Sequence, residues 1–230
     1  MTGNKKSNRF VGRLTPAQIA QGMNCANSNA KRLLNDAELL CENGRFASAV
    51  GLGVLAIEEA GKEAMLRTLA LAESANELNE AWRDYRTHTS KNRLFAVPFL
   101  NAHGTMGLED LKPLFKGSEY PQSIEDLKQR SLYSDCLGGD RWSSPNEAIC
   151  EEMAKGVIAA ARAVIKNKTQ VTEKEVELWL QHMAPIKDKD WELKKAALKN
   201  WFADLVRLGL LKGNADDYAR FVDGKKRWLN

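Results

Sequence analysis

Residues 45–62 read RFASAVGLGVLAIEEAGK, and this stretch decides the fold class. Apolar and small residues occupy nearly every side of a helix from Phe46 to Ile57, which predicts a central, buried helix over about residues 45–71. The apolar run covers 12 residues, including one Ser and two Gly, whereas a membrane-spanning helix needs about 20. The stretch therefore favours the core of an all-α globular protein that does not span a membrane.

The segment before this helix predicts another long helix. Thr15-Pro16-Ala17-Gln18 is a helix start, because it offers an N-cap threonine, a proline in the first turn and a glutamine three residues after the cap. Asn43-Gly44 is the matching stop, since glycine accepts the left-handed conformation that often follows a helix end. Apolar residues recur between these signals at spacings of three and four and form one stripe: Ala26, Ala30, Leu33, Ala37 and Leu40.

The rest of the chain also has helical patterning. Ser144-Pro145-Asn146-Glu147 repeats the pattern of cap, proline and acid, and it predicts one long helix to about Ile165. No stretch shows the alternation of a strand of useful length. The other predicted elements are helices over about residues 75–95, 108–115, 172–183, 191–211 and 216–228, a short helix capped by Ser123, and a turn over residues 137–140.

Length, charge and cysteine content narrow the class of protein. The chain has 230 residues, which is long enough for one domain with a small attachment. Its formal net charge is +4. We expect a flexible N-terminus over residues 1–14, a helical bundle over 15–167 and an α-helical C-terminal extension over 168–230. The four cysteines lack metal-ligand spacing, and the first ten residues lack an apolar signal. We therefore expect a soluble cytoplasmic protein with reduced core cysteines, no metal and no cofactor.

One segment, WRDYRTHTSKNR over residues 82–93, carries groups suited to chemistry. Residues 83–93 contain four Arg or Lys and one Asp, so this stretch has a charge of +3, which suits a phosphate-rich ligand. Asp84 and His88 are four residues apart and would share one helix face, where the carboxylate can fix the imidazole tautomer. Arg83 lies five residues before His88. The alternative interpretation is a solvated, charged helix face with one surface histidine.

These groups could cleave RNA without a metal ion. His88 would act as general acid and base on the 2′-OH and the leaving oxygen, and Arg83 would bind the phosphate and stabilise the developing charge. Asp84 would orient these groups. The expected products are a 2′,3′-cyclic phosphate and a 5′-OH. The other cations of the segment are candidates for binding RNA phosphates: Arg86, Lys91 and Arg93.

Ordered blocks between residues 16 and 165 resemble a known family. They run from Asn29 to Leu40, Gly44 to Ala49, Leu55 to Lys62, Arg83 to Lys91, Lys128 to Asp135 and Trp142 to Pro145. Together they resemble the AbiV-type abortive-infection branch of the HEPN superfamily. The part after about residue 170 lies outside this resemblance.

The resemblance implies an HEPN-like up-and-down helical bundle that forms a homodimer. Many HEPN domains are metal-independent endoribonucleases with an Arg-x4–6-His motif, often with a polar residue after the arginine, and Arg83, Asp84 and His88 match that pattern. Two copies of the motif would face each other across the dimer cleft. The branch is associated with stopping phage multiplication, with translation as the affected process, so a phage-encoded protein or activator is a further candidate partner.

Two acids and two further histidines need their own interpretation. Glu58 would pair with Lys62 at a spacing of four, which would leave Glu59 to face inward or into the cleft. Either acid could instead orient Arg83 or His88 from the neighbouring helix. His103 lies in the Gly-containing connection without a clear role, and His182 ends a predicted helix, where it would complement the helix dipole.

Two other functions fit the same residues. The chain could be a non-catalytic HEPN module that binds a phage protein, a nucleotide or RNA, and defence that survives His88→Ala would favour this alternative. It could also be a toxin that a partner holds inactive, although the sequence does not reveal such a partner.

Overall fold

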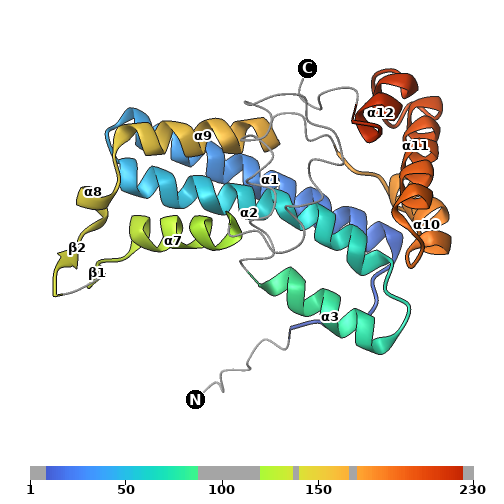
Figure 1. Cartoon of the computed structure of the whole chain (residues 1–230), viewed down its shortest axis with the longest axis horizontal. Helices are drawn as coiled ribbons and strands as arrows, with labels where there is room; N and C mark the ends of the chain where they lie inside the picture. Colours follow the sequence, from blue (N-terminus) through green and yellow to red (C-terminus); the bar gives the residue numbers. More distant parts are fainter. Residues whose placement is uncertain (1–8, 88–119, 137–139, 166–169, 225–230) are drawn as a thin grey trace, which may run out of the picture.

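Two long antiparallel helices, α1 (Pro16–Glu42) and α2 (Phe46–Ala70), form the centre of the structure, which is a computed structural model (Figure 1). The model describes residues 9–87, 120–136, 140–165 and 170–224. Thr15 and Gln18 form the predicted capping box at the start of α1, with Thr15 N–H donating to Gln18 Oε1 at 2.9 Å. Gly44, with φ of +71°, turns the chain into α2. The predicted start of the first helix at Thr15 and its predicted stop at Asn43-Gly44 are both confirmed.

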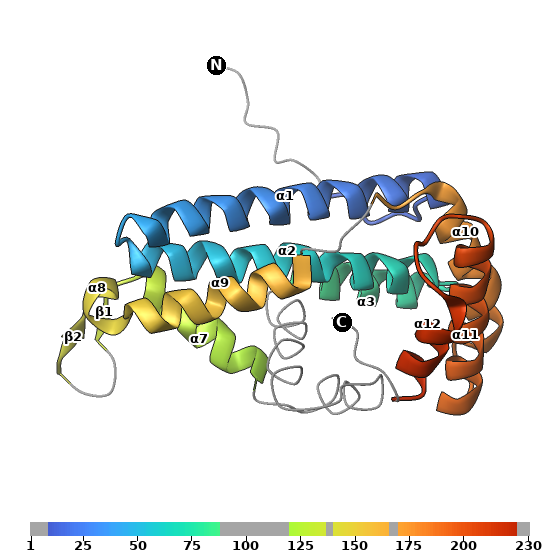
Figure 2. The same ribbon diagram turned by 90° about the horizontal axis from the view of Figure 1, so that it is seen from above.

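The buried helix α2 organises the bundle around itself. The helices α7 (Tyr120–Leu132) and α9 (Glu151–Ile165) pack along its N-terminal half, and α3 (Ala75–Arg86) packs beside its C-terminal half (Figures 1 and 2). The fold is therefore the all-α bundle that the sequence predicts. Two glycines let α7 and α9 approach closely, because a Cβ on Gly51 would lie 2.5 Å from Leu132 and one on Gly53 would lie 2.7 Å from Val157.

The C-terminal helices form a small unit at the end of the bundle opposite the α1–α2 turn (Figure 2). It consists of α10 (Glu173–Met183), a short 3₁₀ turn (Ala184–Ile186), α11 (Trp191–Arg207) and α12 (Ala215–Val222). Trp201 is buried in its core, and Trp179 packs against the same cluster. The unit rests on the bundle through α10, since Val176 belongs to the same buried cluster as Trp82 of α3.

Several predicted helix boundaries are wrong, including those of the helices expected over residues 191–211 and 216–228, which end at Arg207 and Val222. The helix expected to run to residue 95 ends at Arg86, because Thr87 is extended (φ −86°, ψ 128°) and its hydroxyl donates to the carbonyl of Arg83 at 2.9 Å. The helix expected to be capped by Ser123 begins at Tyr120 instead, and a proline in its first turn costs no helical hydrogen bond. The helix expected from Ser144 to Ile165 is interrupted, as described next.

The interruption between α8 (Pro145–Ala148) and α9 falls at Ile149. This residue is extended (φ −122°, ψ 124°) and only 4% exposed, so leaving the helix places its side chain in the core. Just before α8, two short strands that the sequence did not predict pair antiparallel: β1 (Asp135–Cys136) and β2 (Trp142–Ser143). The predicted turn between them falls largely outside the described residues.

The exposure of the cysteines differs from expectation. All four are thiols rather than disulfides, but Cys25, Cys136 and Cys150 are exposed, so the prediction of core cysteines is wrong for these three. The last part of the segment predicted to be flexible, residues 10–13, is held against α3 by several contacts. None of the helices in the described part of the chain combines the length and apolar character that a bilayer crossing requires.

Candidate functional site

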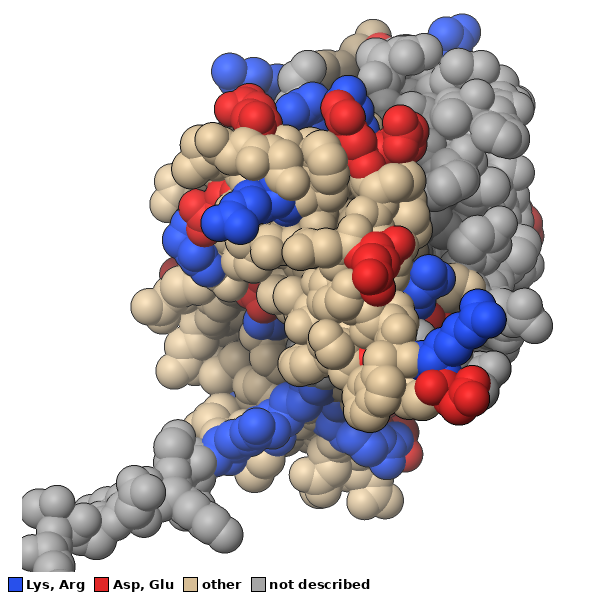
Figure 3. Space-filling model, turned by 90° about the vertical axis from the view of Figure 1, so that its left-hand side faces the viewer, with Lys and Arg blue, Asp and Glu red and all other residues tan. Residues whose placement is uncertain are grey.

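Helix α3 carries the described part of the Arg-x4-His motif. Ser74 and Glu77 form a capping box at its start, and its last turn contains Arg83, Asp84 and Arg86. Cations in this turn are favourable, because the carbonyl end of a helix carries partial negative charge. Viewed from the end that carries α8, Lys and Arg side chains gather along the lower edge, beside the N-terminal trace and at the level of α3, while the middle of this face is largely uncharged (Figure 3).

Arg83 and Asp84 are both exposed on this last turn. In the portion of the chain that the structure describes, neither side chain forms a hydrogen bond or an ion pair. None of the donors of the Arg83 guanidinium is taken up by a described residue, and a phosphate could accept from two of them at once. The adjacent carboxylate offers only acceptors, so it suits a hydroxyl or an imidazolium rather than a phosphate.

His88, Lys91, Arg93 and His103 lie outside the described residues, so the structure does not give their distances to Arg83. The contact between Asp84 and His88 therefore stays a prediction, and Asp84 itself lies in the last turn of α3, which ends at Arg86.

Arg86 is half-buried and already has two contacts. Its guanidinium lies 4.9 Å from the ring of Trp82 and donates to the backbone carbonyl of Phe10. Its proposed use in binding phosphate stays a prediction, and it would have to draw on the remaining N–H groups.

Glu58 and Glu59 exchange the roles that the sequence suggested. Lys62 pairs with Glu59, three residues away, and its ammonium lies 5.7 Å from the ring of Tyr85 on α3. Glu58 is 2% exposed and pairs with Lys128 of α7 at 2.8 Å. The predicted Glu58–Lys62 pair is therefore wrong, because a tertiary partner replaces the local one. Of the two acids, Glu59 has the connection to α3, through Lys62.

Lys128 is a residue whose role the sequence did not reveal. Its ammonium also contacts Glu125 at 2.7 Å, so one buried cation joins two carboxylates between α2 and α7. Burial acts to lower the pKa of Lys128, but the hydrogen bonds to Glu125 and Glu58 outweigh it and raise the pKa. The lysine therefore stays charged and fixes α7 on α2.

His182 has a simple structural role. It stands in the last turn of α10, as expected, and its Nε2 lies 2.9 Å from Asp204 Oδ2 of α11. Hydrogen bonds from Arg207 first, and from His182 second, lower the pKa of Asp204. Because no nucleophile accompanies this pair among its recorded contacts, it serves to join α10 to α11.

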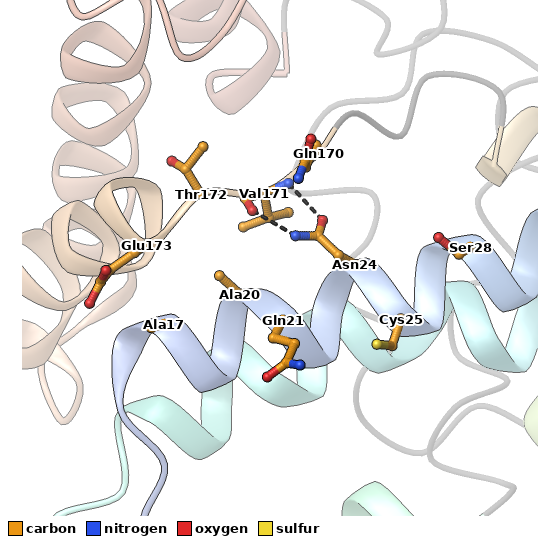
Figure 4. Close-up of a pocket in the computed structure, with 10 residues that line it drawn as sticks. All are labelled: Ala17, Ala20, Gln21, Asn24, Cys25, Ser28, Gln170, Val171, Thr172 and Glu173. Atoms are coloured by element: carbon orange, nitrogen blue, oxygen red, sulfur yellow. Dashed lines mark hydrogen bonds between the residues drawn. The ribbon is translucent and has the colours of Figure 1, made fainter.

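An open pocket between α1 and residues 170–173 offers a second place to look for a site (Figure 4). Asn24 uses its amide twice there, donating to the carbonyl of Val171 and accepting from its N–H, both at 2.8 Å. The other lining groups are small or uncharged, with Glu173 as the exception. Within the described ranges, no three His, Cys, Asp or Glu side chains cluster as metal ligands would. The last turn of α3 is the better candidate.

Comparison with known proteins gives one informative finding. The family model HEPN_AbiV, described as AbiV, matches residues 18–166. This match covers α1 to α9 and includes Arg83, Asp84 and His88. No curated protein and no solved structure matches the chain.

Proposed function

The chain belongs to the AbiV family of HEPN proteins, and from this membership we propose that it is an abortive-infection protein that cleaves RNA without a metal ion. One observation carries the proposal beyond the family. Within the matched region, Arg83 stands in the last turn of α3 with an exposed guanidinium that has no partner among the described residues. An arginine left unpaired beside a basic segment is suited to a phosphodiester.

The reaction would use the RNA's own 2′-OH as nucleophile. His88 removes the 2′-OH proton as the 2′-oxygen attacks phosphorus, and a protonated imidazole returns a proton to the leaving 5′-oxygen. Arg83 donates two hydrogen bonds to the phosphoryl oxygens, which gain charge in the transition state. The P–O5′ bond breaks and leaves a 2′,3′-cyclic phosphate and a 5′-OH. Asp84 orients the imidazole or Arg83, and Lys91, Arg93 and Arg86 bind neighbouring phosphates.

The proposal includes a homodimer acting in the cytoplasm, where two copies of the motif would share one cleft. A single α3 presents Arg83 on an open surface, and an open surface leaves the phosphate in water, where electrostatic stabilisation is weak. A second copy facing the first would bring two guanidinium groups and two imidazoles together and would exclude that water. Blocking translation through RNA cleavage would stop phage multiplication.

The test compares purified wild type with Arg83→Ala, His88→Ala and Arg220→Ala on total RNA. Arg220 is a matched control, because it is also exposed in the last turn of a helix, α12. Loss of a transition-state donor or of the acid–base group lowers the cleavage rate by about 10²-fold or more. We expect this loss for Arg83→Ala and His88→Ala and full activity for Arg220→Ala. Equal cleavage by all four proteins, or no cleavage by the wild type, would refute the proposal.

A further inference from the structure

The N-terminal residues Phe10 to Arg13 lie across α3 and contact both of its ends; we name them the N-terminal strap. At the C-terminal end, Trp82 Nε1 donates to the carbonyl of Gly12 at 3.0 Å and Arg86 donates to the carbonyl of Phe10. At the N-terminal end, Arg13 donates to the carbonyl of Glu73 at 2.6 Å, just before the helix begins. Two carbonyls of the strap thereby accept from side chains of α3, and a third hydrogen bond joins the strap to the residue two positions before the helix.

Trp82 is the centre of these contacts. Its side chain is buried, at 8% exposed, and the ring of Phe10 meets it edge-on with centroids 6.1 Å apart. Tyr85 also meets it edge-on at 5.6 Å, and the Arg86 guanidinium lies 4.9 Å from it. Edge-to-face pairs and cation–π contacts of this kind add to the energy of plain burial.

Gly12 has a specific reason to be glycine. A Cβ at this position would lie 2.6 Å from the end of the Phe10 ring, because that ring folds back over the strap. A side chain at position 12 would therefore push Phe10 away from Trp82. The backbone carbonyl of residue 12 can then stay near Trp82 Nε1, while the contact between the rings of Phe10 and Trp82 is lost.

The strap holds the turn that bears Arg83. Trp82 and Arg86 lie one residue before and three residues after Arg83, on the last turn of a helix that ends without a glycine cap. Beyond Arg86 the helix gains no further turns, so its end is the part most prone to fraying. Contacts on both sides of Arg83 restrict that fraying, and a phosphate clamp must be placed to within a fraction of an ångström to be effective.

We propose that the N-terminal strap is a positioning element for catalysis and that Trp82 and Arg86 are positioning residues that act through Arg83. This inference rests on the proposed nuclease function. Arg86 then anchors the turn through its contacts with Phe10 and Trp82 and keeps its remaining N–H groups for a neighbouring phosphate, whereas Arg83 contacts the reacting phosphate.

The test uses the full chain with three single changes in the strap. Phe10→Ala removes the ring from Trp82, and Gly12→Ala adds a methyl group that displaces the ring. Val11→Ala is the matched control, because Val11 is 51% exposed, close to the 57% of Phe10, and makes none of these contacts. Two measurements are made on each protein: hydrogen–deuterium exchange of peptides spanning residues 81–87, and kcat and KM for RNA cleavage.

For Phe10→Ala we expect exchange in residues 81–87 to rise about twofold to tenfold, with an unchanged unfolding midpoint for the whole chain. We expect kcat to fall by a similar factor while KM changes by less than about twofold, because the loosened turn still binds RNA but holds the transition state less well. Gly12→Ala should reproduce both effects.

The two proposals fail in distinguishable ways. If exchange in residues 81–87 does not change in Phe10→Ala, the strap does not hold α3 and the inference is overturned, whether or not the protein cleaves RNA. If exchange rises but kcat and KM stay at wild-type values, the strap is purely structural and the positioning role is overturned. A wild type that does not cleave RNA would refute the nuclease function and the positioning role that depends on it.

Discussion

Replacing Lys128 with methionine should destabilise the protein more than most single substitutions. Lys128 is 5% exposed and its ammonium lies 2.8 Å from Glu58 and 2.7 Å from Glu125. Methionine fills nearly the same space but removes the cation, so Glu58, at 2% exposed, stays buried without it. Breaking a buried pair from one side costs about 3–5 kcal/mol, which is a large share of the roughly 5–15 kcal/mol that stabilises a typical domain.

The free energy of unfolding is measured by urea denaturation followed by circular dichroism, for three variants beside wild type. Lys128→Met should lose about 3–5 kcal/mol, and combining it with Glu58→Leu should recover most of that loss, because the more deeply buried carboxylate is then removed together with its cation. The remaining acid, Glu125, is more exposed and keeps its hydrogen bond from Gln129. Lys155→Met is the control, since Lys155 forms an exposed pair with Glu151 and should change little. A loss below about 1 kcal/mol for Lys128→Met, or no recovery in the double variant, would refute the reasoning.

Two further predictions concern acid stability and core packing. Hydrogen bonds from the Glu73 backbone and from Lys187 lower the pKa of Glu77 to about 2. The ionised carboxylate therefore stabilises the folded protein at pH values above 4.5, its pKa in the unfolded chain, and this stability is lost as the pH falls toward 2. Glu77→Gln should make the urea midpoint fall less steeply between pH 5 and about 2, and an unchanged slope would contradict the lowered pKa of Glu77. Gly53→Ala should lower the free energy of unfolding by about 1–3 kcal/mol, because its new methyl group would lie 2.7 Å from the buried side chain of Val157. Thermal unfolding should show a lower Tm, and an unchanged Tm would contradict the close packing of α2 against α9.

The sequence predicted the helices that have their own start and stop signals. Thr15 and Thr172 cap α1 and α10 as expected, and Gly44 ends the first helical hairpin. These signals are local, so a single sequence displays them. The end of α3 has no such signal: Thr87 stops it by leaving the helix and bonding back to a carbonyl, and threonine occurs inside helices as well. The break at Ile149 was hidden because its apolar spacing also fits a continuous helix.

The sequence singles out candidate residues for the site but not the contacts around them. The motif residues Arg83 and Asp84 stand out in sequence by their charge, and the structure places both on an exposed turn. The Glu58 pairing was misassigned because its partner Lys128 is 70 residues away, and a spacing rule within one helix cannot find it. The contact between Gly12 and Trp82, also 70 residues apart, was missed for the same reason.

The most direct test of the proposed nuclease is the chemistry of its product ends. Wild type and Arg83→Ala are incubated with RNA in excess EDTA, and the new 3′ and 5′ ends are identified by mass spectrometry. We expect the wild type to leave 2′,3′-cyclic phosphates and 5′-hydroxyls at its full rate in the chelator, and Arg83→Ala to leave almost none. Cleavage that stops in EDTA, or products with 3′-hydroxyl and 5′-phosphate ends, would contradict the account.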